Sequence, residues 1–307
     1  MSLLLFPGQG TQKVGMARDL AARFPAAREC LGSLDEAVGV GLTRIMWEGP
    51  EEDLQRTFNT QPAILAHSAA VLAVVAAKLG PVAGAAGHSL GEYSAYLAAG
   101  AIDAADAIRL VRHRGQLMHE AGMARPGAMA AVLGLDGAQV VAACERVSTP
   151  GAVAVAANMN APDQTVISGD PAAVVKAGDL CKAAGARRVM ALKVGGAFHS
   201  PLMGAAQAGL AAALSAVTVR DPSFPVVANA TATPVRTAAE ARRLLEAQLT
   251  APVQWVESIK ALRTLGAEAR FVEIGPGTVL GGLVKRIIPE AVVVSLGTAD
   301  EVERFVA

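Results

Sequence analysis

The segment Gly87–Gly91, with the sequence GHSLG, limits more than any other feature how this chain can fold. It matches the pattern G-x-S-x-G, in which a serine lies on a sharp turn between a strand and a helix. Small apolar residues, 82–86, precede it, and a helix-like run, 92–99, follows it. We expect Ser89 at the top of a sheet, at a helix N-terminus whose dipole favours a developing anion. A purely structural turn in a chain rich in alanine and glycine gives the same pattern.

Composition narrows the class of protein. The chain has 307 residues, which is enough for one large α/β domain or two smaller ones. Of these residues, 52% are hydrophobic and 18% are charged. The 27 basic and 27 acidic residues balance, so charge gives no argument for binding nucleic acid or an anionic membrane. The most apolar stretch, 69–77, is about half as long as the roughly 20 residues of a spanning helix. We therefore expect no membrane segment but a buried helix there, which begins at Gln61-Pro62 and carries residues 63–79.

The N-terminus and the cysteines indicate a cytoplasmic protein. Residues 3–6 are apolar, but they have no basic region before them and no cleavage site after them, so they predict a buried strand rather than a signal peptide. The three cysteines are scattered and form no CxxC pair, which is typical of inert thiols in a reducing compartment.

The middle of the chain has a different pattern from its two ends. Strands are predicted at 128–135, 153–158, 164–168 and 188–194, and helices at 136–147 and 171–184. This order, βαββαβ, is that of a ferredoxin-like unit. We expect residues 123–194 to form an inserted subdomain. Residues 1–122 and 195–307 are expected to form one α/β domain around a central, mainly parallel sheet.

A serine nucleophile needs a base, and five histidines are available. His67 lies within a predicted helix, and His113 and His119 lie on a charged helix face. His88 adjoins the serine but is expected to point to the other side of the turn. His199 lies in a Gly-rich loop between a strand and a helix, where catalytic residues often lie, although a histidine beside a Ser-Pro helix start is the plainer interpretation.

No acidic residue is a convincing partner for this histidine. In the chain order of a hydrolase triad, the acid lies between the serine and the histidine. The aspartates between Ser89 and His199 that are candidates lie at caps and turns of the predicted subdomain. A Ser–His pair works without an acid if a carbonyl oxygen accepts the imidazole N–H.

Six motifs, in order, carry a resemblance to a known family: FPGQGTQ (6–12), GHSLGEYSA (87–95), HRGQLMHEA (113–121), GAMAAVLG (127–134), GAFHSPLM (196–203) and QLTAPVQW (248–255). The chain resembles the malonyl-CoA:acyl carrier protein transacylases of fatty acid and polyketide synthesis. The resemblance covers essentially the whole chain and extends as far as EIGPG at 273–277. The resemblance implies an α/β-hydrolase-like large domain with a ferredoxin-like insertion, in agreement with the pattern above.

The resemblance also implies roles for single residues. Ser89 looks like the nucleophile and His199 like its general base. The backbone N–H groups of Gln9 and Leu90 resemble the family's oxyanion hole. Gln248 resembles the residue whose main-chain carbonyl orients the histidine.

A second group of residues resembles the substrate site. Arg114 looks like the clamp for the malonyl carboxylate, since a guanidinium pairs with two carboxylate oxygens, although it is also one of several arginines on a helix. Met118 lies in the same motif as Arg114. Phe198, directly before His199, resembles the residue that malonyl-selective members have at this position. Asn158 and Asn160 are placed to meet substrate or pantetheine, or serve only as turn residues.

The expected function is a two-step transfer of malonyl from malonyl-CoA to the phosphopantetheine thiol of an acyl carrier protein. No metal and no redox cofactor are implied, and we expect a monomer. Three alternatives stay open at this point: a serine esterase or thioesterase, an acyltransferase with a different acyl-CoA preference, and a catalytically inactive acyl-binding or scaffold domain. A carboxylate clamp at Arg114 would distinguish a transferase from the first.

Overall fold

The apolar run at the N-terminus forms the central strand β1 (Ser2–Phe6), and all five of its residues are buried. The computed structural model describes residues 1–307. The large sheet has the order β10-β9-β1-β2-β7-β8. Its other strands are β2 (Val82–Gly87), β7 (Val226–Val227), β8 (Pro234–Val235), β9 (Arg270–Ile274) and β10 (Val293–Leu296). All neighbouring pairs are parallel except β7 and β8, which are antiparallel.

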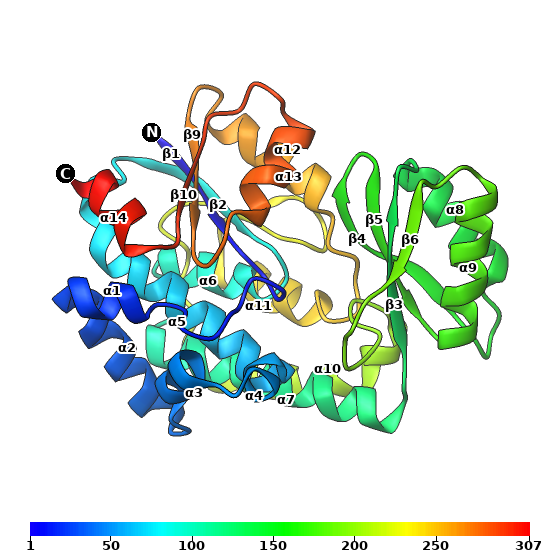
Figure 1. The fold of residues 1–307 in the computed structure, drawn as a ribbon, viewed down its shortest axis with the longest axis horizontal. Helices are drawn as coiled ribbons and strands as arrows, with labels where there is room; N and C mark the ends of the chain where they lie inside the picture. The colour runs from blue at the N-terminus through cyan, green and yellow to red at the C-terminus, as the bar shows by residue number, and fades with distance from the viewer.

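Alternate residues of β1 pack into two different cores, one on each side of the sheet. Leu4 and Phe6 belong to the core that contains α5 and α6, and Leu3 and Leu5 to the core that contains α12 and α13. Because successive side chains of a strand point to opposite faces, this makes a three-layer α/β/α body (Figure 1). The expected α/β class is confirmed.

The large body has seven helices before the smaller lobe in the chain and five after it. In the N-terminal half they are α1 (Arg18–Arg23), α2 (Pro25–Val38), α3 (Leu42–Glu48), α4 (Glu51–Gln55), α5 (Thr57–Val75), α6 (Gly91–Ala98) and α7 (Ala104–Ala124). In the C-terminal half they are α10 (Gly204–Ala216), α11 (Ala238–Ala247), α12 (Trp255–Leu265), α13 (Val279–Ile287) and α14 (Ala299–Val306). Short 3₁₀ turns, Ala76–Lys78 and Pro201–Met203, adjoin α5 and α10.

Helix α5 is longer than the sequence pattern predicts. It begins at Thr57, not at Pro62, and continues through that proline. Proline has no N–H to donate to the carbonyl of Phe58 four residues earlier, and Arg112 from α7 donates to that carbonyl instead, at 3.2 Å. With its 3₁₀ extension the helix, Thr57–Lys78, is long and apolar enough to cross a membrane, but 72% of its apolar window is buried within the protein. It is the core helix of this body.

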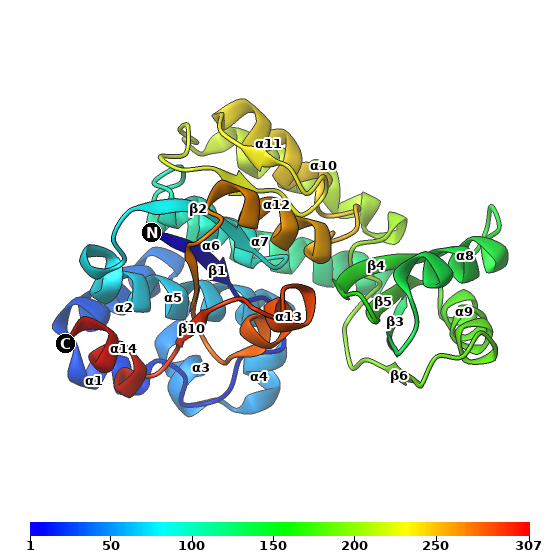
Figure 2. The same cartoon turned by 90° about the horizontal axis from the view of Figure 1, so that it is seen from above.

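The smaller lobe is a four-stranded antiparallel sheet covered by two helices. Its elements are β3 (Ala128–Leu133), α8 (Gly137–Val147), β4 (Ala154–Ala161), β5 (Gln164–Gly169), α9 (Pro171–Ala183) and β6 (Arg188–Ala191). The strand order β4-β5-β3-β6 is that of a ferredoxin-like unit. Both helices lie on the outer face, away from the large body (Figures 1 and 2). The inner face is therefore free to cover the large body.

Two boundaries of this lobe differ from the sequence pattern. Helix α7 ends at Ala124, so it crosses the predicted boundary at 122/123 by half a turn. Strand β6 ends at Ala191 rather than at Val194, because residues 192–194 leave the sheet and line a cavity. The division into residues 1–122 with 195–307 and residues 123–194 stays a prediction.

Backbone hydrogen bonds join the two lobes. Val253, in the loop before α12, donates to the Ala157 carbonyl at 2.8 Å and accepts from Met159 at 3.0 Å. Arg286 of α13 also reaches the β4–β5 turn and donates to Asp163 and Gln164. Strand β4 is thus attached to the large body on two sides.

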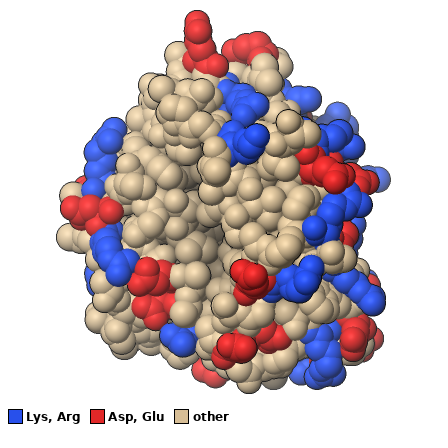
Figure 3. All heavy atoms as spheres, turned by 90° about the vertical axis from the view of Figure 1, so that its left-hand side faces the viewer, with Lys and Arg blue, Asp and Glu red and all other residues tan.

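On the end of the large body that lies opposite the smaller lobe, the charged side chains lie mainly around the edge (Figure 3). Basic and acidic side chains alternate around the edge of that face, and its middle is uncharged. Neither sign of charge dominates the face, as expected from the balanced composition.

Candidate active site

Three loops meet at the carboxyl edge of the large sheet. They follow β1, β2 and β9, which are neighbours and parallel, so their ends lie at one edge. The chain after β1 and β2 passes to the side of the sheet that carries α5 and α6, whereas the chain after β9 passes to the side that carries α13. Ligands of α/β proteins bind at such switch points. The loop after β1 carries Gln9, and the loop after β2 carries Ser89.

The turn at Ser89 has the geometry that the GHSLG pattern predicts. Ser89 has φ 53°, in the left-handed region that costs a non-glycine residue about 1–2 kcal/mol. A Cβ at Gly87 would lie 1.9 Å from the carbonyl of Gly91, and a Cβ at Gly91 would lie 2.2 Å from the Phe6 oxygen. Both glycines are therefore required by the close approach of backbone, and the turn holds the serine between strand and helix.

His199 lies against this serine. Its Nε2 is 2.8 Å from Ser89 Oγ, and its Nδ1 is 2.9 Å from the Gln248 carbonyl and 3.2 Å from the Ala251 carbonyl. Carbonyl oxygens only accept, so Nδ1 carries the proton and Nε2 offers its lone pair to the serine hydroxyl. Two carbonyls take the place of the acid that the sequence lacks.

The imidazole of His199 is neutral in this environment. Burial, together with the positive charge of Arg114, lowers its pKa from 6.5 to about 3. His199 also has a positive φ, 55°, which turns its side chain toward the elbow. A neutral, oriented imidazole is the form that can take a proton from serine.

The two backbone donors named from the sequence lie beside the serine. Gln9 and Leu90 both line the cavity, and their N–H groups donate to no acceptor within the protein. The N–H of Ser89 itself is occupied, since it donates to Asn229 Oδ1 at 2.8 Å. Free N–H groups beside a nucleophile are suited to hold the oxyanion of an acyl-transfer intermediate.

Arg114 reaches the same point from α7. It is 1% exposed, and its guanidinium donates to Ser89 Oγ at 3.1 Å and to Gln248 Oε1 at 2.9 Å through Nη2. Nη1 donates to Gln61 Oε1 at 2.8 Å, and no carboxylate forms an ion pair with it. Burial lowers the pKa of Arg114, and the nearby Glu92 is among the groups that oppose this shift. Because an arginine side chain stays protonated in proteins, the fold holds a cation next to the nucleophile that no carboxylate contacts directly.

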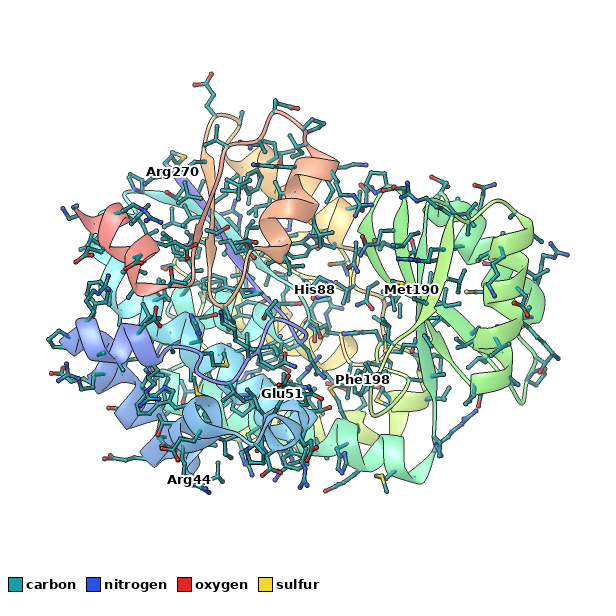
Figure 4. The ribbon with its side chains drawn as sticks, in the orientation of Figure 1. Arg44, Glu51, His88, Met190, Phe198 and Arg270 are labelled. Carbon is teal, nitrogen blue, oxygen red and sulfur yellow. The ribbon has the colours of Figure 1, made fainter.

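A cavity of about 520 Å³ contains these groups. Both lobes line it: Met129 and Val166 come from the inner face of the small sheet, and residues 192–194 from the segment after β6. His88 and Phe198 lie at the junction of the lobes, with Met190 on the side of the smaller one (Figure 4). The remaining lining residues are Gln9, Gly10, Gln12, Gln55, Gln61, Ser89, Leu90, Arg114, Met118, Asn158, Asn160 and His199.

The cavity therefore brings together nine of the ten residues named from the sequence, and Gln248 lies just beneath it. Met118 and Phe198 form apolar parts of the wall. Asn160 Oδ1 accepts a hydrogen bond from Nε2 of His88 at 2.8 Å, so His88 faces β4 and not the serine. Asn158 lies beside Val253 at the junction with the large body.

Sequence reasoning missed several polar residues of the site. Gln61 holds the guanidinium, Asn229 holds the Ser89 N–H, and Ala251 supplies the second carbonyl to His199. Glu92, on the first turn of α6, is wholly buried beneath the elbow. Only the proximity of Glu92 to the GHSLG motif gave any signal.

A serine on a strained elbow, a neutral histidine and two free backbone donors are the parts of an enzyme that transfers acyl groups through serine. The chain belongs to the acyl transferase family, since the family model described as "Acyl transferase domain" matches residues 3–305.

Curated relatives narrow the family further. The chain is 44% identical over 285 residues to the malonyl CoA-acyl carrier protein transacylase of Escherichia coli K12, covering 92% of each chain. It is 40% identical to that of Bacillus subtilis, over 97% of this chain and 94% of the relative. The resemblance stated from the motifs is confirmed.

Solved structures agree over the whole fold. An acyl carrier protein S-malonyltransferase from Vibrio cholerae superimposes with a TM-score of 0.94 at 39% identity, covering 99% of both chains. A malonyl-transacylase solved in complex with its type II polyketide synthase acyl-carrier protein has a TM-score of 0.94 at 40% identity, over 99% of this chain and 98% of that one.

Proposed function

We propose that this protein transfers a malonyl group from malonyl-CoA to the phosphopantetheine thiol of an acyl carrier protein, through an ester on Ser89. The family and the names of the relatives support the overall reaction. The observation that supports the acyl group is Arg114, a buried guanidinium beside the nucleophile that no carboxylate of the protein contacts directly. It suits an acyl chain that ends in a carboxylate.

In the first step, His199 Nε2 takes the proton from Ser89 Oγ as that oxygen attacks the thioester carbonyl. The N–H groups of Gln9 and Leu90 hold the oxyanion that forms. The C–S bond then breaks, the carbonyl re-forms as a serine ester, and the imidazolium returns its proton to the thiolate of coenzyme A.

In the second step, the carrier thiol enters in place of coenzyme A. His199 takes the thiol proton, and the sulfur attacks the carbonyl carbon of the ester. The bond between this carbon and Ser89 Oγ then breaks, and the imidazolium returns its proton to Oγ. Arg114 pairs with the free malonyl carboxylate throughout, so the acyl group keeps its place while the two thiols exchange. We assign Met118, Phe198, Asn158 and Asn160 to the substrate wall, and the reaction as written uses no metal or redox cofactor.

The same clamp separates this function from the alternatives. An esterase or thioesterase of neutral acyl groups would leave the buried cation of Arg114 unpaired, which is costly. A binding domain without activity has no need of a strained serine 2.8 Å from a neutral histidine. The cytoplasmic location and the monomeric state stay predictions.

Mass spectrometry of the intact protein after mixing with malonyl-CoA tests the proposal. We expect a malonyl adduct on the wild-type protein, its loss on addition of phosphopantetheinylated carrier protein, and no adduct on Ser89→Ala. Ser94→Ala is the matched control, because Ser94 is a buried serine of the helix that follows the elbow, α6, and has no hydrogen-bond partner. An adduct that survives Ser89→Ala, or one that water removes as fast as the carrier does, would contradict the proposal.

A further inference from the structure

Glu92 is a buried carboxylate that the mechanism above does not use. It has no exposed surface and lies on the first turn of α6, three residues after the nucleophile. Its Oε2 accepts from Gln248 Nε2 at 2.7 Å and from the backbone N–H of Asn229 at 3.0 Å. Its Oε1 has no partner in the protein. Since burial of a carboxylate is unfavourable, its contacts are expected to serve some purpose.

Gln248 connects this carboxylate to the base. Its main-chain carbonyl accepts from His199 Nδ1, and its side-chain Nε2 donates to the Ser89 carbonyl at 2.9 Å as well as to Glu92. Its Oε1 accepts from Arg114, which fixes the orientation of the amide. The position of the carbonyl that orients His199 thus depends on an amide that Glu92 holds.

Asn229 connects the same carboxylate to the elbow. Its backbone N–H is bound by Glu92, and its side chain bonds both sides of the turn: Oδ1 accepts from the Ser89 N–H, and Nδ2 donates to the Gly87 carbonyl at 2.7 Å. These contacts support a serine whose backbone lies in a strained region.

We propose that Glu92 is a positioning residue, which aligns the base through Gln248 and the nucleophile through Asn229. The inference rests on the proposed acyl transfer at Ser89. What matters is the reach of the Glu92 oxygen to two donors, and its negative charge is not required for the alignment.

Two conservative variants separate reach from charge. Glu92→Asp keeps the charge but withdraws the carboxylate by about 1.5 Å, the length of one C–C bond, out of hydrogen-bond range of both donors. Glu92→Gln removes the charge but keeps an oxygen at the position of Oε2. We expect Glu92→Asp to lower the acylation rate constant at saturation by roughly ten- to a hundredfold, with malonyl-CoA and acetyl-CoA alike. Glu92→Gln should stay close to wild type.

Glu273→Asp provides the matched control. Glu273 is equally buried, but it accepts from the N–H groups of Leu280 and Gly281 and from Ser295, none of which belongs to the site. This variant should lose thermal stability and keep the acylation rate constant per folded molecule. It measures what the loss of a buried carboxylate contact costs the fold alone.

The experiment is rapid-quench intact-mass spectrometry of acyl-enzyme formation at varied acyl-CoA, with the folded fraction measured by thermal denaturation. In Glu92→Asp a lower rate constant with little change in the half-saturating concentration supports the positioning role. A wild-type rate constant per folded Glu92→Asp molecule would overturn it. The proposal would also be overturned if Glu92→Gln lowered the rate constant by the roughly ten- to hundredfold expected of Glu92→Asp. This second measurement keeps the proposal testable if the aspartate variant does not fold. Failure of the proposed function itself would be seen separately, as a wild-type protein that forms no adduct.

Discussion

Replacement of Arg114 tests most directly how the site selects its acyl group. In the structure its guanidinium is bonded only to the neutral oxygens of Ser89, Gln248 and Gln61, so a substrate carboxylate would be the first carboxylate in direct contact with it. A charge-assisted contact of this kind contributes about 1.5–3 kcal/mol, or roughly 10- to 150-fold in rate. Arg114→Ala should lower malonyl transfer by at least that factor.

The same change should favour neutral acyl groups. Arg114 is one cause of the low pKa of His199, so its removal makes the base stronger, and it also removes a buried cation that acetyl leaves unpaired. The ratio of the acylation rate with malonyl-CoA to that with acetyl-CoA should therefore fall by a larger factor than the rate with malonyl-CoA does. Arg114→Lys should recover little of it, because an ammonium does not form the paired contact.

The assay is the ratio of the two acylation rates in each protein, since a ratio cancels any general loss of alignment. Arg112→Ala is the matched control: Arg112 lies on the same helix but is bonded to the Phe58 carbonyl and Asn59, outside the cavity. A ratio that is equal in wild type, Arg114→Ala and Arg112→Ala would refute the clamp and favour an esterase.

Four further predictions concern the nucleophile, its turn and its base. His199→Ala should lower the acylation rate by about 10²–10⁴-fold, measured by rapid quench, and an unchanged rate would show that another group is the base. Because burial and Arg114 hold the pKa of His199 near 3, the wild-type rate should be level from about pH 8 to about pH 5 and fall only below that, and a pH profile with its midpoint near 6.5 would contradict this. The same depressed pKa means that His199 favours the folded state fully above pH 6.5 and loses this effect as the pH falls toward 3, which thermal denaturation at several pH values can follow. Gly91→Ala should abolish adduct formation, since its methyl would lie 2.2 Å from the Phe6 oxygen, while Gly204→Ala, where nothing lies within 4 Å, should acylate normally.

Much of the fold could be predicted because its signals are local. The GHSLG segment specifies its own turn through glycines that only close backbone approach explains. The βαββαβ pattern likewise gave the smaller lobe from its alternating strands and helices. The start of α5 was missed because continuation through Pro62 depends on a hydrogen bond from Arg112, fifty residues later, which no local pattern contains.

The residues of the site likewise fall into those with a local sequence signal and those without one. Residues in motifs, such as Ser89 and Arg114, could be named from the sequence. Asn229 and Gln61 could not, because each is a single amide in an ordinary context and gains its role only when the chain brings it to the elbow. The carbonyls that orient His199 have no signature of residue type at all, so only the resemblance pointed to Gln248.

Both partners of the reactive hydrogen bond, Ser89 and His199, have a backbone in the left-handed region. Glycine at either position would relieve about 1–2 kcal/mol of strain, partly offset by the greater freedom it gives the unfolded chain. Ala17 and Ala232 are the other non-glycine residues with a positive φ, so two of the four positions of this kind are the ones that the reaction requires. A search for thermostable variants that ignored activity would be drawn to all four positions, and one that selected for activity could use only Ala17 and Ala232.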